Sequence, residues 1–146
     1  MPDLKDPIWF ATPQLDEANA RGNGTMVSHL GIRVSEIGPD FMKATMPVDD
    51  TTRQPVGILH GGATLALAET VGSIAANYCV DGRKQYCVGL DINANHIRSI
   101  GSGVVTATAS PLHLGRSTQV WETLIHDEEG RLVSAGRLTM AVLNRP

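Results

Sequence analysis

Most of the information in this chain lies in residues 54–73, which read Gln54-Pro55-Val56-Gly57-Ile58-Leu59-His60-Gly61-Gly62-Ala63-Thr64-Leu65-Ala66-Leu67-Ala68-Glu69-Thr70-Val71-Gly72-Ser73. Two polar side chains, Gln54 and His60, precede a pair of glycines, and an almost wholly apolar segment follows. The apolar pattern continues to Val80, so it is too long for a strand, and it is apolar on nearly all sides. It therefore predicts a buried central helix from His60 to Val80.

The start of this helix is suited to binding an anion. The first amides of a helix have no acceptor inside it, and the positive end of the helix dipole adds to their attraction. Glycines at positions 61 and 62 let another group approach that backbone closely. Glu69 is the only charged residue between His60 and Val80, and burying a lone carboxylate is costly unless something uses or pairs it. Together these features favour acyl chemistry.

The composition predicts one domain with a core of small aliphatic side chains. The chain has 146 residues, 42% of them hydrophobic but only 4% aromatic. That length is enough for one core and too short for two, so we expect a single domain over residues 1–146. The formal net charge of −3 gives no general attraction to nucleic acid or to an acidic membrane surface. Any anionic ligand would have to be held by local cations.

Cysteine usage and the N-terminus indicate the compartment. Cys79 and Cys87 have no CxxC spacing and no further ligands arranged as a zinc site, so we expect no metal and two reduced, buried thiols. The alternative is contact between them where a helix meets a strand. The N-terminus lacks a signal-peptide pattern, and polar residues interrupt the apolar run too often for a membrane span. We therefore expect a cytoplasmic protein outside the membrane. The chain has no P-loop or GxGxxG motif, so a mononucleotide-binding fold does not compete. No cofactor is expected.

The segments before the helix read as an arm and a strand pair. Residues 1–21 form a loose N-terminal arm, in which 14–20 make a short helix before a break at 21–24. Two short strands, 32–37 and 41–48, surround a Gly-Pro-Asp turn. A loop over 49–58 then leads to the central helix.

Four strand-like runs follow the helix. They cover residues 86–96, 104–112, 118–126 and 132–143, with turn residues between them. Consecutive strands joined by short turns pair antiparallel, so each of these runs is expected to pair with the next. The predicted fold is α+β, with an antiparallel sheet wrapped around one long central helix.

Seven segments form an ordered set along the chain. In chain order they are residues 44–49, Gln54-Pro55, Leu59-His60-Gly61-Gly62-Ala63, Leu67-Ala68-Glu69-Thr70, and residues 89–96, 111–115 and 119–122. In this order they resemble the hotdog-fold acyl-CoA thioesterases, and the resemblance extends over residues 22–143. Within that family they are similar to the branch of the 1,4-dihydroxy-2-naphthoyl-CoA thioesterase of menaquinone synthesis and the proofreading thioesterase of enterobactin synthesis. The resemblance implies a hotdog fold and hydrolysis of an acyl-CoA, with an aromatic acyl group as the leading substrate.

The resemblance implies four catalytic residues, Glu69, Gly61, His60 and Gln54. Glu69 would attack the thioester carbonyl or activate the water that does so, and the sequence does not separate these roles. The Gly61 amide would stabilise the oxyanion, while His60 and Gln54 would lie beside the thioester or the attacking water. The alternatives are structural: a carboxylate neutralised by burial or paired with a distant arginine, a glycine needed for steric reasons, and a histidine that only caps the helix.

Further residues are implied in substrate binding. Thr70 and Ser73 share a helix face with Glu69, although the Ser73 hydroxyl could instead bond back to its own helix. The nucleotide and pantetheine groove is implied at Gly89, His96-Ile97-Arg98-Ser99 and His113-Leu114-Gly115-Arg116-Ser117-Thr118. Arg98 and Arg116 would hold the phosphates of coenzyme A, or would be solvated surface charges.

A distance argument predicts a site shared between subunits. Gly61 and Glu69 are eight residues apart on one helix, which is about 12 Å at about 1.5 Å per residue. One carbonyl carbon must lie near both the attacking group and the oxyanion donor. Two antiparallel helices across a two-fold axis can meet this condition, because each places its start beside the middle of the other. We therefore expect a dimer, and the resemblance implies a tetramer.

Three functions compete for this sequence. The first is hydrolysis of a thioester, either an acyl-CoA or an acyl group carried by a partner acyl carrier protein. The second is a hydratase or dehydratase, which the hotdog fold also supports, although the required histidine and acid pair is not found. The third is a non-catalytic acyl-CoA binder or scaffold.

Overall fold

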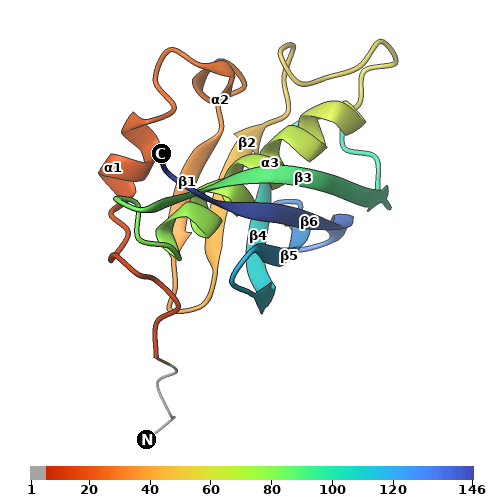
Figure 1. The fold of residues 1–146 in the computed structure, drawn as a ribbon. Helices are drawn as coiled ribbons and strands as arrows, with labels where there is room; N and C mark the ends of the chain where they lie inside the picture. Colours follow the sequence, from red (N-terminus) through yellow and green to blue (C-terminus); the bar gives the residue numbers. More distant parts are fainter. Residues whose placement is uncertain (1–5) are drawn as a thin grey trace, which may run out of the picture.

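The computed structural model describes residues 6–146, so the first five residues of the predicted N-terminal arm lie outside it. It contains three helices and six strands in the described part of the chain (Figure 1). They are α1 (Leu15–Ala20), α2 (Met26–His29), β1 (Arg33–Ile37), β2 (Met42–Pro47), α3 (Gly61–Tyr78), β3 (Gln85–His96), β4 (Val104–Leu114), β5 (Thr118–His126) and β6 (Leu132–Asn144).

The six strands form one antiparallel sheet in the order β1-β2-β4-β5-β6-β3. The long helix α3 crosses the concave side of this sheet, and the strands curve around it (Figure 1). The predicted α+β fold with a sheet wrapped around one central helix is confirmed. Because β1 and β3 lie at opposite ends of the sheet order, each leaves one edge without a partner strand in residues 6–146.

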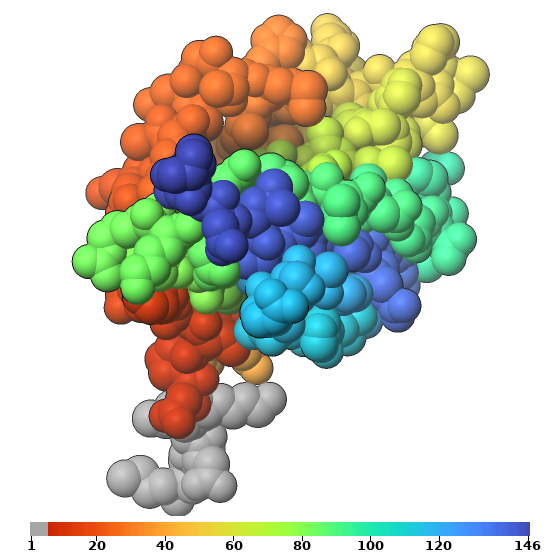
Figure 2. Space-filling view, viewed as in Figure 1, coloured from red at the N-terminus to blue at the C-terminus, as the bar shows by residue number. Residues whose placement is uncertain are grey.

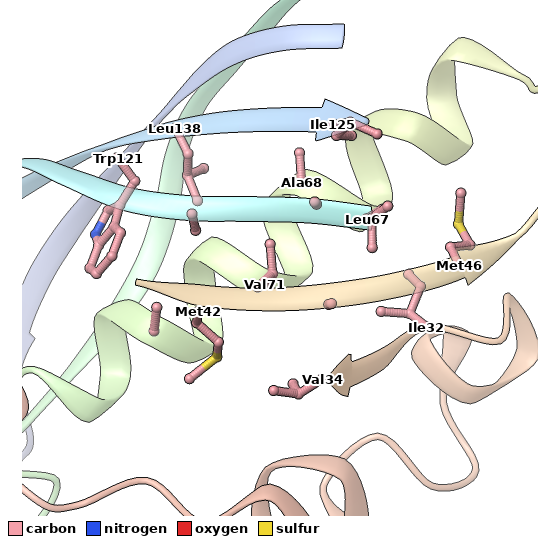
Figure 3. Packing of buried hydrophobic residues seen from close by; sticks show 14 of the residues in the cluster. Ile32, Val34, Met42, Met46, Leu67, Ala68, Val71, Trp121, Ile125 and Leu138 are labelled. Atoms are coloured by element: carbon pink, nitrogen blue, oxygen red, sulfur yellow. The ribbon is translucent and has the colours of Figure 1, made fainter. Parts of the chain in front are cut away.

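The core lies between α3 and the sheet. Leu67 and Val71 of α3 are fully buried and face inward-pointing residues of the strands, including Trp121 and Leu138 (Figure 3). Close contact depends on the small residues of the helix, because a Cβ at Gly72 would lie 2.5 Å from Cδ2 of Leu138. The alternating burial along β2 and β5 follows from the two-residue period of a strand with one face on the core.

The expected pairing of consecutive strands is confirmed for β4 with β5 and for β5 with β6, but it is wrong for β3 with β4. β3 pairs instead with β6, in a register that runs from Gln85 opposite Asn144 to His96 opposite Ser134. Residues 97–103 do not form a hairpin because their backbone is used elsewhere. The N–H groups of Ile97 and Arg98 donate to Val133 O, and the Leu59 N–H donates to Ile100 O.

The N-terminal segment is more ordered than the sequence predicts. The short helix expected at 14–20 is present as α1, but α2 was not expected, since a single turn leaves no periodic pattern. Its start is capped by the Thr25 hydroxyl, which accepts the Val27 N–H at 3.2 Å. Within the predicted loose arm, the Ile8 N–H donates to Pro39 O and the Phe10 N–H to Tyr78 O. This part of the arm is therefore held against the rest of the chain.

Cys79 and Cys87 are both free, at the end of α3 and in β3. Burial raises the pKa of the Cys79 thiol to about 12 and that of the Cys87 thiol to about 11. Cys87 is fully buried as expected, whereas Cys79 is half-buried. Both groups are therefore protonated near neutral pH, which makes them poor nucleophiles.

No helix in residues 6–146 combines the length and the hydropathy needed to cross a bilayer.

Candidate active site

The start of α3 leaves the amide of Gly61 free. His60 is the residue before the helix: its carbonyl accepts the Thr64 N–H at 3.0 Å, and its Nδ1 accepts the Gly62 N–H at 2.8 Å. The Gly61 N–H, between these two bonds, has no acceptor in the described residues. The capping role weighed for His60 is therefore present, while its Nε2 stays available. An unpaired amide at the positive end of a helix is the donor that an oxyanion requires.

Gln54 is held in a tight turn that fixes the direction of its side chain. Its N–H donates to Ile58 O at 2.8 Å, and its carbonyl accepts the Gly57 N–H at 2.9 Å. Gly57 has a φ of +88°, a conformation that glycine adopts without strain. The side-chain oxygen of Gln54 accepts the Val56 N–H at 2.5 Å. That oxygen is therefore occupied, and the NH₂ group is left as a donor.

Arg53 holds the loop that carries Gln54 in place, a role that was not predicted from the sequence. Its Nε donates to Gly101 O at 3.0 Å, and its Nη1 pairs with Asp50 at 2.9 Å. The neighbouring Thr52 is buried, and its carbonyl accepts the His60 N–H at 2.8 Å. The loop and the helix start are thus tied together and to residues 100–101. The only local signal was the position of Arg53 directly before the motif.

A pocket of about 260 Å³ lies at the helix start, and we call it the helix-start pocket. It brings together Gln54, Gly61, Thr64 and the segment 96–99, so part of the predicted catalytic set does meet part of the predicted coenzyme A groove. The ring of His96 lies against Gly61, because a Cβ at position 61 would be 2.9 Å from its Nε2. A side chain at this position would therefore crowd both the ring and the free amide.

Glu69 lies in a separate pocket of about 300 Å³ in the middle of α3, which we call the Glu69 pocket. Thr70, Ser73 and Ile74 of α3 form one wall, and Ala18, Arg21, Gly22 and Val27 of the α1–α2 segment form the other. The surface is hollowed between this orange segment and α3 (Figure 2). The side chain is half-buried, and its carboxylate has no hydrogen bond or ion pair within residues 6–146. Glu69 is therefore not paired with a distant arginine in the described residues, which was one of the structural alternatives.

Three predicted binding residues lie in the Glu69 pocket or beside Glu69. Gly89 lies in β3 at a bulge, and a Cβ there would overlap with Oε1 of Glu69, so glycine makes room for the carboxylate. The Ser73 hydroxyl contacts the sulfur of Met140 at 3.7 Å rather than Glu69 or its own helix. Thr70 and Ser73 both line the Glu69 pocket.

The predicted segment 113–118 lies far from both pockets in one chain. It forms the turn between β4 and β5, where the Gly115 N–H donates to Thr118 O at 2.9 Å. Leu114, Gly115 and Arg116 line a pocket of about 290 Å³ together with Cys79, at the opposite end of α3 from Gly61. His113 packs against Gly115, and Ser117 accepts the Val142 N–H. The fold of one chain therefore separates the predicted site residues into three groups.

Arg98 and Arg116 are exposed and have no carboxylate partner within residues 6–146. Arg98 belongs to the helix-start pocket and Arg116 to the pocket at the other end of α3. Both are free to bind an anion, but one chain does not bring them together. No group of three or more His, Cys, Asp or Glu residues that could hold a metal occurs in the described chain.

Known proteins resemble this chain in sequence and in fold. Residues 56–134 match the thioesterase superfamily. The chain is 52% identical over 136 residues to the 1,4-dihydroxy-2-naphthoyl-CoA hydrolase of Escherichia coli, covering 93% of this chain and 99% of that protein. It is 48% identical to the proofreading thioesterase EntH of Cronobacter sakazakii, covering 93% and 98%. A mutant thioesterase from Pseudomonas aeruginosa has the same fold, with a TM-score of 0.94, 45% identity and coverage of 94% and 99%.

The chain belongs to the thioesterase superfamily, and it is a thioester hydrolase with the hotdog fold. The resemblance seen in the sequence is confirmed. These relatives support thioester hydrolysis over the lyase and the non-catalytic binder or scaffold.

Proposed function

We propose that this enzyme hydrolyses an aromatic acyl-CoA, such as 1,4-dihydroxy-2-naphthoyl-CoA, in a site shared by two copies of the chain. The observation that carries the proposal is the separation of the helix-start pocket, with its free Gly61 amide, from the pocket that holds Glu69. The two residues are about 12 Å apart along α3. The relative with 52% identity, named as a hydrolase of that substrate, supports the choice of acyl group.

The edge strand β3 suggests how two copies would complete the site. It is twelve residues long, pairs only with β6 in the described chain, and exposes 40% of Val88 and 62% of Leu90. A long edge strand with exposed apolar residues is a template for pairing with another strand. On β3, Gly89 lies beside Glu69 and His96 lies beside Gly61. Antiparallel pairing of two β3 strands centred between these positions would set each Gly61 beside Glu69 of the partner subunit.

In such a site each group has a distinct role. The Gly61 N–H binds the thioester carbonyl oxygen, and the Gln54 NH₂ group donates to that oxygen or to the attacking water. Glu69 of the partner subunit takes a proton from water as hydroxide adds to the carbonyl carbon, and the Gly61 amide stabilises the oxyanion. The C–S bond then breaks, and the thiolate of coenzyme A takes the proton back from Glu69. The products are the free acid and coenzyme A.

Direct attack by Glu69 is the other route, through an acyl–carboxylate anhydride that water hydrolyses. A single turnover in H₂¹⁸O detects the direct route when water attacks the protein carbonyl of this anhydride. Attack by Glu69 on the thioester, followed by attack of water on the protein carbonyl, leaves ¹⁸O in the Glu69 carboxylate, whereas a general base leaves it only in the product acid. Mass spectrometry of the peptide that contains Glu69 reads the outcome.

The proposed activity is tested by thiol release over a panel of CoA thioesters that includes 1,4-dihydroxy-2-naphthoyl-CoA, benzoyl-CoA and short alkyl-CoAs. We expect the highest kcat/KM with the aromatic compounds. Faster turnover of short alkyl-CoAs would contradict the substrate class, and no thiol release from any compound would contradict the proposal itself.

Release of misloaded acyl groups from a carrier protein is the second candidate. Its support is the 48% identity to a relative named proofreading thioesterase. Adding an acyl carrier protein thioester to the same panel compares the two directly. We extend the proposal to a pair of dimers and to a cytoplasmic enzyme, a setting that two free cysteines suit.

A further inference from the structure

The wall of the Glu69 pocket opposite α3 consists mostly of small side chains. Ala18, Gly22 and Val27 line it, together with Arg21. Ala18 is only 2% exposed and belongs to the core, so its methyl group lies at the inner end of the pocket. The Arg21 side chain is 63% exposed and therefore lies at the mouth. The pocket thus runs from a charged mouth to a hydrocarbon inner end.

This wall is held in place by hydrogen bonds to the sheet and the chain before it. The Asn19 side chain pairs with the backbone of β1 as a neighbouring strand would: its Nδ2 donates to Val34 O at 3.0 Å, and its Oδ1 accepts the Val34 N–H at 2.8 Å. At the other side of the wall, the Ile32 N–H donates to Val27 O at 2.9 Å. Ala18, which directly precedes Asn19, and Val27 are therefore fixed in position.

Because the backbone of the wall is fixed, the size of its side chains determines the room in the pocket. The free volume is about 300 Å³. A Cβ at Gly22 would lie 2.8 Å from Cγ1 of Val27, so position 22 has no room for a side chain. Ala18 differs, because its methyl group borders the free volume while its other side is packed in the core. A larger side chain at position 18 would therefore extend into the pocket.

The two walls also differ in polarity. Glu69, Thr70 and Ser73 carry polar groups on the α3 wall, whereas Ala18 and Val27 present only hydrocarbon. In the proposed mechanism Glu69 acts beside the thioester carbonyl, so the part of the acyl group next to the thioester meets the polar wall. The part remote from the thioester then reaches the hydrocarbon end, where a ring without polar substituents loses nothing on burial.

We propose that Ala18 sets the upper size of the acyl group, and that the space beside its methyl group takes the second ring of a fused bicyclic aromatic acyl group. This inference rests on the proposed function, because it assigns the Glu69 pocket to the acyl group. In 1,4-dihydroxy-2-naphthoyl-CoA both hydroxyls are on the ring that bears the thioester, and the other ring is hydrocarbon. That distribution of polar groups matches the two walls.

The test measures binding rather than turnover. Two non-hydrolysable CoA thioethers, one with a 2-naphthoylmethyl group and one with a benzoylmethyl group, are compared by titration calorimetry. We expect wild-type protein to bind the naphthoyl compound at least about tenfold more tightly, because its second ring is buried against hydrocarbon. Ala18→Leu should weaken that compound at least about tenfold and leave the benzoyl compound within about twofold, since one methylene of misfit in an apolar pocket is worth about 10- to 200-fold.

Ala20→Leu is the matched control, because Ala20 is on the same helix, is exposed and lies outside the Glu69 pocket. It should leave both affinities unchanged. Ala18→Val adds less bulk and should show the same selective loss at smaller size, so it replaces Ala18→Leu if the larger side chain overpacks the core and prevents folding. The calorimetric stoichiometry reports the folded fraction of each variant, separately from its affinity.

Four results would overturn the inference: no wild-type preference for the naphthoyl compound, unchanged selectivity in a folded Ala18 variant, equal weakening of both compounds by that variant, or the same selective loss in Ala20→Leu. The hydrolysis panel is a separate readout. Selective loss of naphthoyl binding without thiol release from any CoA thioester would contradict the proposed function and leave the size limit standing. Hydrolysis of aromatic acyl-CoAs with unchanged binding selectivity would do the reverse.

Discussion

The helix-start pocket and the Glu69 pocket differ in how their polar groups are held. Around Gly61, hydrogen bonds made by Arg53, Thr52 and Gln54 fix the loop, and the Gly61 amide is left free. In the Glu69 pocket, the carboxylate has no hydrogen bond or ion pair in residues 6–146, and Arg21 has one exposed ion pair. One chain therefore fixes the geometry for stabilising an oxyanion, whereas the polar groups around the carboxylate are left for a ligand or a second chain.

The strongest test of this difference is the removal of the carboxylate. Glu69→Gln keeps the shape of the side chain but removes its basicity and nucleophilicity, so kcat should fall by at least about 100-fold. Binding of the thioether analogues should survive. Glu36→Gln is the control, since Glu36 lies on β1 and pairs with Lys43 at the surface. Near-normal turnover by Glu69→Gln would eliminate the proposed mechanism.

The helix start should tolerate change less well than a glycine elsewhere. Gly61→Ala places a Cβ 2.9 Å from Nε2 of His96 and crowds the free amide, so kcat should fall about 10- to 100-fold. Gly82→Ala is a matched control, because a Cβ there meets nothing within 4 Å. Steady-state kinetics of both variants makes the comparison. Equal activities would mean that the Gly61 amide is not the oxyanion donor.

Mixing the two impaired variants tests whether the pockets of different chains work together. Hybrid dimers of Glu69→Gln and Gly61→Ala subunits would contain one intact site, so an equimolar, fully exchanged mixture should recover about a quarter of wild-type activity. Native mass spectrometry confirms the exchange. If hybrids form and activity does not return, each site belongs to one chain.

The smallest expected effect concerns the exposed arginines. Arg98→Ala and Arg116→Ala should raise KM for acyl-CoA while kcat stays within several-fold, because exposed phosphate contacts act on binding and are screened by salt. Acyl-pantetheine substrates, which lack the nucleotide, should not respond to either change. Equal damage with the truncated substrate would instead place these residues at the reacting centre or in a structural role.

Local patterns in the sequence predicted most elements to within two residues, and long-range pairing was the part they missed. The central helix was expected from His60 to Val80 and runs from Gly61 to Tyr78. β4 was expected to end at Leu112, but a bulge between Pro111 and His113 lets its pairing continue to Leu114. The prediction of the strand that pairs with β3 was wrong. Residues 97–103 form hydrogen bonds with distant backbone groups, and no turn residue in the sequence indicates this.

The candidate site divides in the same way. Gln54, His60, Gly61 and Glu69 stand out in a short motif whose chemistry can be read locally, although their roles stay predictions until the variants are measured. Arg53 and Tyr78 could not be identified from the sequence. Arg53 acts through its hydrogen bond to Gly101, which is distant in the sequence, and the Tyr78 hydroxyl is notable because it has no hydrogen bond in the described residues.

The position of Gly89 and His96 on one strand limits how this protein can change its length. Gly89 makes room for Glu69 and His96 covers Gly61, and seven residues of extended chain, about 23 Å, separate the two contacts. Inserting one residue between them would turn every following side chain to the opposite face of the sheet. Inserting two would restore the faces but displace the contacts by about 7 Å. Insertions and deletions should therefore be tolerated in the loops of this enzyme but not between residues 89 and 96.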